Sequence, residues 1–379
     1  MNRAADTPSP ECDWPRKVYL EPTTQCNLDC AMCIRRSWDQ SGGTMSAGTF
    51  ERILAQVDEL PRPLTINFSG YGEPMVHPRF CELLSRAKDA GFSIEVVTNG
   101  TLLGPEAAER LIDLRLDKLI VSLDGISDAS SRMLHTRSFA IVAANLQALH
   151  QRRLARNAAH PEVAIEFVAT RGNIHELPEL KRLSSVLGFS GILVTNLIPH
   201  TPELEGETLY ERWSTSPRGS APSPYNPLVD LPLMDSHSPA DEVLQRLRDG
   251  LTHLRVGGAD VFGGGQRCPF VAQGRLAIRY DGRVSPCLPL MHGHTYYFRG
   301  RPKHVRAYHV GDVNESPLKD IWRSHGYRAF RRRVRDFEFS PCIDCAGCDL
   351  RETNQEDCSG DAFPRCGECL WAAGLVQCP

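Results

Sequence analysis

The chain has 379 residues, which is enough for two or three domains. Its net charge of −3 argues against a general nucleic-acid binder, and no apolar run approaches the roughly 18 residues of a membrane span. The first residues, 1–15, lack the apolar segment of a secretory signal and read as a flexible N-terminus. These features predict a cytoplasmic protein without a membrane anchor.

Residues 16–200 alternate between β-rich runs and helical patterns. The predicted strands are 17–23, 64–70, 93–100, 117–125, 162–170 and 191–198. The predicted helices between them are 46–60, 77–91, 105–114, 139–155 and 176–188, with Ser46 as an N-cap. Strands that alternate with helices form parallel sheets through right-handed crossovers. Six units are too few for a closed eight-stranded barrel, so we expect an α/β fold with a partial (β/α)6 TIM-like barrel.

The rest of the chain changes character twice. Residues 201–262 are rich in Pro, Ser and Gly and read as a linker or extension, interrupted by one predicted helix at 240–254. Residues 263–379 form a cysteine-rich segment with a predicted hairpin at 278–284, in which Asp281 and Gly282 make the turn. We therefore expect two folded domains separated by an extension.

Four unusual segments come directly after the first four predicted strands. They are the cysteine-containing loop 21–38, "SGYGEP" at 69–74, "TNG" at 98–100 and "SLDG" at 122–125. The carboxyl ends of parallel strands share one rim of a sheet, where functional groups gather. These segments therefore predict one active site.

The first loop carries Cys26, Cys30 and Cys33 in a C-x3-C-x2-C spacing. Clustered cysteines in a cytosolic chain indicate metal binding rather than disulfides. Structural zinc uses four closed ligands, and no fourth Cys or His lies nearby. A 4Fe–4S cluster held by three thiolates leaves one iron open to a small molecule, which explains the number three.

The other three segments offer contacts for such a ligand. Gly70 and Gly72 let the backbone approach a ligand closely, beside Glu73 and Pro74. Ser122 and Asp124 are two positions apart, so on a strand they face the same side, as two contacts to one ribose require. Each feature alone is weak, because Gly–Pro turns are common and an Asp in this position can form an Asx-turn.

Together, these motifs resemble the radical S-adenosylmethionine (SAM) superfamily over residues 16–200. The resemblance implies that the open iron chelates SAM and that an electron cleaves it to methionine and a 5′-deoxyadenosyl radical, with reduced ferredoxin or flavodoxin as the donor. It also implies that backbone at 70–73 meets the SAM amino group and that Ser122 and Asp124 lie near the ribose. Asn99 and Asn173 are further candidates, and Arg132 and Arg137 both stay open for the SAM carboxylate.

The C-terminal segment holds nine cysteines: Cys268, Cys287, Cys342, Cys345, Cys348, Cys358, Cys366, Cys369 and Cys378. Their C-x2-C pairs alone also suit zinc. The C-x13-G-x4-C pattern from Cys268 to Cys287 resembles the SPASM domain, which implies two auxiliary 4Fe–4S clusters. Two clusters need eight thiolates, so one cysteine is spare, and the spacing does not tell which.

Two C-terminal stretches suggest the substrate. Residues 279–297 and 357–379 resemble a subgroup of SPASM proteins, the maturases of tungsten-containing aldehyde ferredoxin oxidoreductases. This implies action on the tungsten (pterin) cofactor or its host enzyme. The basic stretch 299–306 could meet the phosphates of such a cofactor, although its composition favours a plain exposed loop. His292 and His294 face one side if 290–297 is extended and could touch the same ligand, and a structural role fits them equally. The alternatives are maturation of a ribosomal peptide or an enzyme side chain, and a non-enzymatic iron–sulfur or zinc module.

Overall fold

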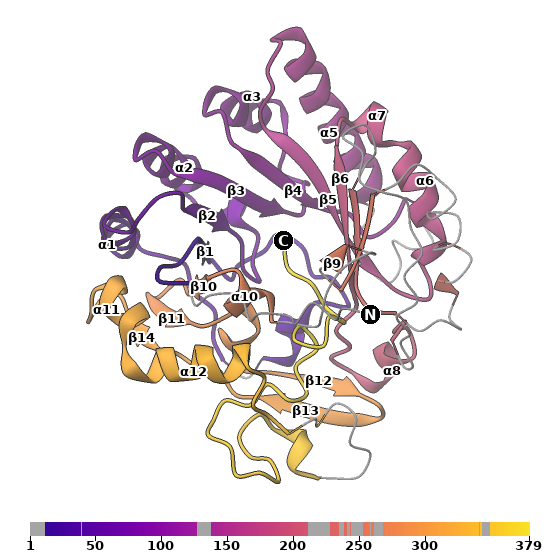
Figure 1. Ribbon diagram of the computed structural model, residues 1–379. Helices are drawn as coiled ribbons and strands as arrows, with labels where there is room; N and C mark the ends of the chain where they lie inside the picture. Colours follow the sequence, from indigo (N-terminus) through magenta and orange to yellow (C-terminus); the bar gives the residue numbers. More distant parts are fainter. Residues whose placement is uncertain are drawn as a thin grey trace, which may run out of the picture.

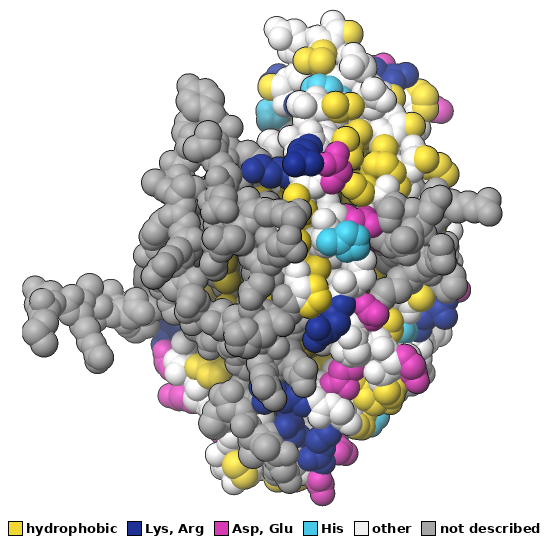
Figure 2. Space-filling model, turned by 90° about the vertical axis from the view of Figure 1, so that its right-hand side faces the viewer, with side chains coloured by type: hydrophobic (Ala, Val, Ile, Leu, Met, Phe, Trp, Pro, Cys, Tyr) yellow, Lys and Arg dark blue, Asp and Glu magenta, His cyan; other side chains and the backbone are white. Residues whose placement is uncertain are grey.

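The computed structural model describes residues 12–38, 40–126, 138–210, 228–234, 239–240, 243, 253–257, 259–260, 268–340, 342 and 349–379. None of the helices in these ranges has the length and apolar character needed to cross a membrane. On the face shown in Figure 2, the described basic and acidic side chains are interspersed rather than gathered by sign.

Six parallel strands form the centre of the molecule and follow one another in chain order across the sheet. The sheet is curved, with helices along its convex side (Figure 1). The predicted partial (β/α)6 barrel is therefore confirmed. The strands are β1 (Lys17–Leu20), β2 (Thr65–Phe68), β3 (Ser93–Thr98), β4 (Lys118–Ser122), β5 (Glu162–Ala169) and β6 (Gly191–Asn196).

The helices between these strands begin where the sequence predicts. Ser46 caps the first of them by accepting a hydrogen bond from the Thr49 backbone N–H at 3.0 Å. Apolar side chains on one face of each helix pack against the sheet and form the main core. The helices are α1 (Ala47–Asp58), α2 (Phe80–Asp89), α3 (Pro105–Asp113), α5 (Ser138–Ala155), α6 (Leu177–Arg182) and α7 (Ser184–Leu187).

Alternation along the strands gives the sheet two unlike faces. Side chains such as Val18, Ile94 and Leu119 are buried under the helices. Their neighbours one position away, such as Lys17, Glu95 and Lys118, point into the concave side, because successive side chains of a strand face opposite ways. The concave side therefore carries charged side chains among apolar ones such as Ile120, whereas the side under the helices is apolar.

Residues 201–262 contribute more than the predicted linker. After α8 (Pro202–Glu205), the strands β7 (Leu228–Leu231) and β8 (His253–Val256) continue the parallel sheet beyond β6, and β9 (Ala259–Asp260) pairs antiparallel with β8. The helix predicted over 240–254 cannot include its last two residues, because they belong to β8. Most of its other residues lie outside the described ranges.

The cysteine-rich segment is joined to the barrel by a strand. β10 (Arg275–Ile278) pairs in parallel with β1, on the side away from β2. The predicted hairpin is confirmed: β10 and β11 (Arg283–Ser285) are antiparallel, and Gly282 in their turn has a φ of 96°. The two domains expected from the sequence therefore share one sheet.

The remaining elements lie around this shared sheet, with the last residues of the chain on its concave side (Figure 1). The strands are β12 (His294–Phe298) and β13 (Arg301–Val305), which form a separate hairpin, and β14 (Gly311–Asp312). The helices are α10 (Pro269–Ala272), α11 (Leu318–Arg323) and α12 (His325–Arg335). The 3-10 turns are η1 (Ile34–Ser37), η2 (Pro74–Val76), η3 (Ile174–Glu176), η4 (Leu288–Leu290) and η6 (Asp349–Glu352).

Candidate active site and cysteine clusters

The loop after β1 holds Cys26, Cys30 and Cys33 together in a compact turn. The Cys33 backbone N–H donates to the Cys30 carbonyl at 3.1 Å. The Arg35 guanidinium donates to the Thr24 carbonyl at 2.7 Å and to the Cys33 Sγ at 3.3 Å. All three thiols are half-buried. Burial, with Cys33 adding to it, raises the pKa of Cys30 to about 12, so a metal must displace a proton to bind this sulfur.

The glycine-containing loop after β2 packs directly on the cysteine loop. A Cβ on Gly72 would lie 2.2 Å from the Thr23 carbonyl oxygen and 2.6 Å from the Gln25 carbonyl oxygen, so only glycine fits there. The Glu73 backbone N–H donates to the same Gln25 carbonyl at 2.8 Å. The loop predicted to meet SAM through its backbone therefore also braces the segment that leads into Cys26.

The Glu73 carboxylate is buried and fully engaged within the protein. It accepts hydrogen bonds from the Thr98 hydroxyl at 2.8 Å, the Met75 backbone N–H at 3.0 Å and the Asn99 backbone N–H at 2.7 Å. Burial raises its pKa despite these three bonds. The carboxylate thus fixes the loop after β2 to the end of β3. Pro74 in this loop is the first residue of the 3-10 turn η2.

Asn99 connects this assembly to the cysteines. Its side-chain amide donates to the Cys26 Sγ at 3.8 Å and to the Asn27 side-chain oxygen at 2.9 Å. Three of the four predicted segments are therefore joined by direct contacts at one rim of the sheet. The prediction that the loops after β1, β2 and β3 meet is confirmed.

The fourth segment, after β4, is built around Asp124. Its Oδ1 accepts from the Val168 backbone N–H at 2.7 Å, and its backbone carbonyl accepts from the Asn173 side-chain amide at 2.7 Å. Burial raises the pKa of Asp124 to about 7. The charge of Asp124 contributes to the raised pKa of Cys30, which places the two groups near each other.

Ser122, the other predicted ribose contact, donates to Glu166 at 3.4 Å. Both predicted ribose contacts therefore have protein partners. Arg132 and Arg137 lie outside the described residues.

Several residues of this region were missed at the sequence level. Glu21, fully buried at the end of β1, receives the Tyr71 backbone N–H at 3.3 Å on one oxygen and contacts His292 Nε2 at 2.8 Å with the other. Trp38 stacks on His292 with ring centroids 4.2 Å apart. The Tyr71 hydroxyl donates to the Leu288 carbonyl at 3.2 Å. These contacts connect the cysteine loop to the C-terminal segment, and no sequence motif predicts them.

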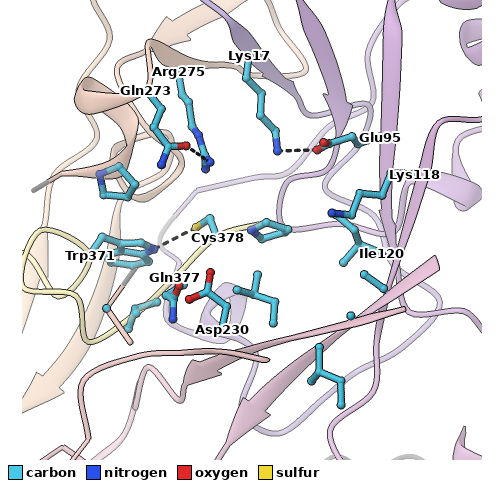
Figure 3. A pocket seen from close by; sticks show the side chains of 18 of the residues that line it. Lys17, Glu95, Lys118, Ile120, Asp230, Gln273, Arg275, Trp371, Gln377 and Cys378 are labelled. Carbon is cyan, nitrogen blue, oxygen red and sulfur yellow. Dashed lines mark hydrogen bonds and ion pairs between the residues drawn. The ribbon is translucent and has the colours of Figure 1, made fainter. Parts of the chain in front are cut away.

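Below the rim, the concave side of the sheet contains a cavity of about 480 Å³. Figure 3 shows that Lys17, Lys118 and Asp230 project into it from the strands and that Cys378 enters from the C-terminal tail. The Lys17 ammonium pairs with Glu95 at 2.5 Å. The tail is held by the Gln377 backbone N–H, which donates to Thr195 at 2.9 Å. The end of the chain therefore forms part of the barrel interior.

A second cavity collects four cysteines from distant parts of the C-terminal segment: Cys268, Cys287, Cys366 and Cys369. The pKa of Cys287 lies well above its ordinary value because of burial, to which the other three thiols add. Among the described residues, no three Cys, His, Asp or Glu side chains are arranged to share one metal ion. Thiols spread around a cavity instead suit a cluster with one thiolate on each iron. The hairpin of β10 and β11 lies between Cys268 and Cys287 in sequence, and both thiols line this cavity.

Three further cysteines of the block fall into two places. Burial raises the pKa of Cys342, and Cys358 is close enough to add to that rise. Cys345 and Cys348 lie outside the described residues. Cys378 stands apart in the barrel interior, where its Sγ accepts a hydrogen bond from the Trp371 indole at 3.1 Å. The block therefore separates into a four-thiol cavity, a group around Cys342 and a solitary tail thiol.

Two basic side chains of the stretch 299–306 are engaged by contacts within the C-terminal segment. Arg301 pairs with Glu352 at 2.8 Å. Lys303 is buried and donates to Glu368 at 3.1 Å and to the Thr353 carbonyl at 2.8 Å. These partners weaken the idea that the stretch receives cofactor phosphates. His292 and His294 also do not face one ligand, because His292 contacts Glu21 while His294 lines the four-cysteine cavity.

The protein is a parallel partial barrel that carries three clustered cysteines on its rim and is followed by a cysteine-rich domain. These features define a radical SAM enzyme with auxiliary iron–sulfur binding. Two family models match accordingly, the radical SAM superfamily over residues 20–177 and the SPASM iron–sulfur cluster-binding domain over residues 268–349. The chain belongs to the radical SAM superfamily and binds a 4Fe–4S cluster and SAM. The second match also favours iron–sulfur clusters over zinc in the C-terminal block.

Similarity to individual proteins extends over nearly the whole chain. The tungsten-containing aldehyde ferredoxin oxidoreductase cofactor-modifying protein of Pyrococcus furiosus is 33% identical over 366 residues, which cover 96% of each chain. The PqqA peptide cyclase of Granulibacter bethesdensis is 24% identical over 93% of this chain and 85% of its own. Streptococcus suis SuiB bound to its precursor peptide SuiA superposes with a TM-score of 0.61 at 16% identity, over 95% of this chain and 77% of SuiB, which shows a shared fold.

Proposed function

We propose that this radical SAM enzyme modifies the tungsten (pterin) cofactor, or its host aldehyde ferredoxin oxidoreductase. The full-length similarity to the Pyrococcus furiosus cofactor-modifying protein supports this substrate. The observation that carries the chemistry is the contact of the Cys26 loop with the loops after β2 and β3. Reduced ferredoxin or flavodoxin is the proposed electron donor.

Cys26, Cys30 and Cys33 are the proposed ligands of the SAM-binding cluster. When bound there, cluster and SAM together supply a 5′-deoxyadenosyl radical for hydrogen abstraction. Arg35 orients this loop by holding Thr24 and Cys33. Gly72 and Glu73 keep the loop after β2 packed against it, so that the backbone at 70–73 is fixed in position for the SAM amino group.

The remaining proposed SAM contacts lie on the β4 side of the rim. Asn173 donates to the Asp124 and Val168 carbonyls at 2.7 and 2.8 Å, and so holds the Asp124 segment against the end of β5. Ser122, Asp124 and Asn99 are the proposed contacts to the adenosine part. Preorganised polar groups of this kind keep the ligand in one pose and exclude water from the reacting carbon.

The auxiliary clusters are assigned by the grouping of the thiols. We assign one cluster to Cys268, Cys287, Cys366 and Cys369, which line one cavity. The second is assigned to Cys342, Cys345, Cys348 and Cys358, which leaves Cys378 as the spare thiol. This assignment uses eight of the nine cysteines, as two clusters require.

Deleting the gene in its host tests the substrate. The aldehyde oxidoreductase purified from the deletion strain should be inactive, and its pterin cofactor should have an altered mass. A gene copy encoding Ala at Cys26, Cys30 and Cys33 should fail to restore it, whereas the wild-type copy restores it. A fully active oxidoreductase with an unchanged pterin would refute the tungsten substrate.

That result would favour the second candidate, maturation of a ribosomal peptide or an enzyme side chain. Its support is the similarity to the PqqA peptide cyclase over most of the chain and the fold shared with SuiB. Mass spectrometry of small peptides in the same deletion strain would then reveal an unmodified precursor.

A further inference from the structure

His294 is a buried histidine in the lining of the four-cysteine cavity. It is the first residue of β12, and only 5% of it is exposed. Together with Cys268, Cys287, Cys366 and Cys369 it lines this cavity. No motif marked it as a partner of these cysteines, because it lies seven residues beyond Cys287 and far from Cys366 in sequence.

The hydrogen bonds of His294 fix which ring nitrogen carries the proton. Nδ1 lies 3.0 Å from the His292 carbonyl oxygen. A carbonyl can only accept, so Nδ1 must carry the hydrogen and donate it. In a neutral ring, Nε2 then presents a bare lone pair.

The Nε2 atom has no hydrogen-bond partner among the described residues. Two other polar side chains of the same lining are engaged, because Lys303 donates to Glu368 and Asn354 receives the Arg306 backbone N–H at 2.9 Å. Arg365, also in the lining, pairs with Asp357, while its Nε has no hydrogen-bond partner among the described residues; as a cation it cannot bind iron. A buried polar atom without a partner costs about 1–3 kcal/mol. An iron atom in the cavity would remove that cost, because a neutral imidazole nitrogen is a good iron ligand.

We propose that His294 Nε2 coordinates an iron of the auxiliary cluster in this cavity, in place of one of the four thiols. The Nδ1–H donation to the His292 carbonyl is the arrangement that orients metal-binding histidines. Five donors then serve four irons, so one thiol of the cavity stays free of iron. Exchange of a thiolate for imidazole raises the reduction potential of a cluster. The inference rests on the iron–sulfur assignment of this cavity.

Pulsed electron paramagnetic resonance on the reduced, reconstituted full-length chain tests this directly. The protein is prepared once with natural histidine and once with 15N-histidine, without SAM. We expect a strong nitrogen hyperfine coupling that changes with the isotope and is lost in His294→Ala, together with a lower reduction potential of one cluster. His309→Asn is the matched control, because His309 also bonds to a backbone carbonyl, that of Met291, but does not line the cavity.

The outcomes separate the inference from the assignment on which it rests. Cluster signals from a protein with about 12 irons, but without a strong isotope-sensitive coupling, would overturn coordination by His294 and leave the auxiliary clusters standing. Zinc in the cavity and no auxiliary cluster signal would overturn both. If His294→Ala fails to fold, the absence of an isotope-sensitive coupling from the wild-type spectrum still overturns the proposal.

Discussion

The two sets of cysteines in this protein have opposite surroundings. The thiols after β1 are contacted by polar groups, such as the Arg35 guanidinium and the Asn99 amide, and leave one iron of a cluster for an outside ligand. The four-cysteine cavity is lined mainly by apolar side chains, among them Phe270 and Trp371. Polar contacts suit a site that must admit a charged cofactor. An apolar wall suits a cluster whose irons are all bound by the protein and that receives no outside ligand.

Replacing Cys26, Cys30 and Cys33 together with Ala should have the largest effect. We expect 5′-deoxyadenosine formation to be abolished and the iron content to fall from about 12 to about 8 per chain, because three cubic clusters become two. The measurement is iron analysis with product chromatography after anaerobic reconstitution. Undiminished 5′-deoxyadenosine from this variant would place the reactive cluster elsewhere.

Removing two cysteines of the four-cysteine cavity should leave the SAM-binding cluster intact. In Cys366→Ala/Cys369→Ala, one auxiliary cluster should be lost, which leaves about 8 irons per chain, while the spectrum of the SAM-binding cluster persists. Cys378→Ser is the matched control, because this thiol lies in the barrel interior and does not line the four-cysteine cavity, although its partner Trp371 lines both cavities. Loss of four irons in the control as well would show that Cys378 is a ligand and not the spare thiol.

The packing of the two rim loops is tested by Gly72→Ala. The added methyl group would clash with the backbone carbonyls of Thr23 and Gln25, so the cysteine loop must shift. Overpacking of this kind costs about 1–3 kcal/mol of unfolding free energy, and SAM cleavage should slow by at least roughly tenfold, which corresponds to about 1.4 kcal/mol in the barrier.

The control for that change is Gly326→Ala, in the first turn of α12. A Cβ at Gly326 meets nothing within 4 Å, and Ala favours a helix more than Gly does, so SAM cleavage should match that of the wild type and stability should not fall. Urea denaturation and the initial rate of 5′-deoxyadenosine formation measure both effects. Equal behaviour of the two variants would remove the structural role assigned to Gly72.

A further expected effect is a pH dependence of stability without bound SAM. Burial raises the pKa of Asp124 from 3.8 to about 7. Between these values the folded chain binds more protons than the unfolded chain, so stability falls as the pH rises from about 4 to about 7. Asp124→Asn removes this titration and should flatten the decline in the urea midpoint. A steeper decline in the variant would contradict the raised pKa.

Most of the fold could be predicted from the sequence because the patterns that indicate it are local. Six apolar strands alternated with amphipathic helices, and Ser46 and Gly282 stood where a cap and a turn need them. The strand β7 was missed because it lies in a stretch whose Pro, Ser and Gly content gives no periodic pattern, and β8 was missed because its first two residues were included in the helix predicted over 240–254. The pairing of β10 with β1 joins residues more than 250 positions apart, which no local pattern predicts.

The candidate site was predicted in its members but not in their contacts. Strand order alone brings Cys26, Glu73 and Asn99 to one rim. The spacing of the C-terminal cysteines could not tell which thiols meet, because that depends on how the tail folds back. Likewise, Lys303 looked like a free cation, yet its charge is buried against Glu368, a partner 65 residues away.

The central claim is that the cysteine loop after β1 cleaves SAM for the modification of a tungsten enzyme or its cofactor. The most direct test combines the reconstituted chain, SAM and a low-potential reductant with the aldehyde oxidoreductase purified from the deletion strain. The account predicts that 5′-deoxyadenosine forms and that its amount rises when this immature oxidoreductase is added. No 5′-deoxyadenosine from a chain carrying about 12 irons would contradict the account.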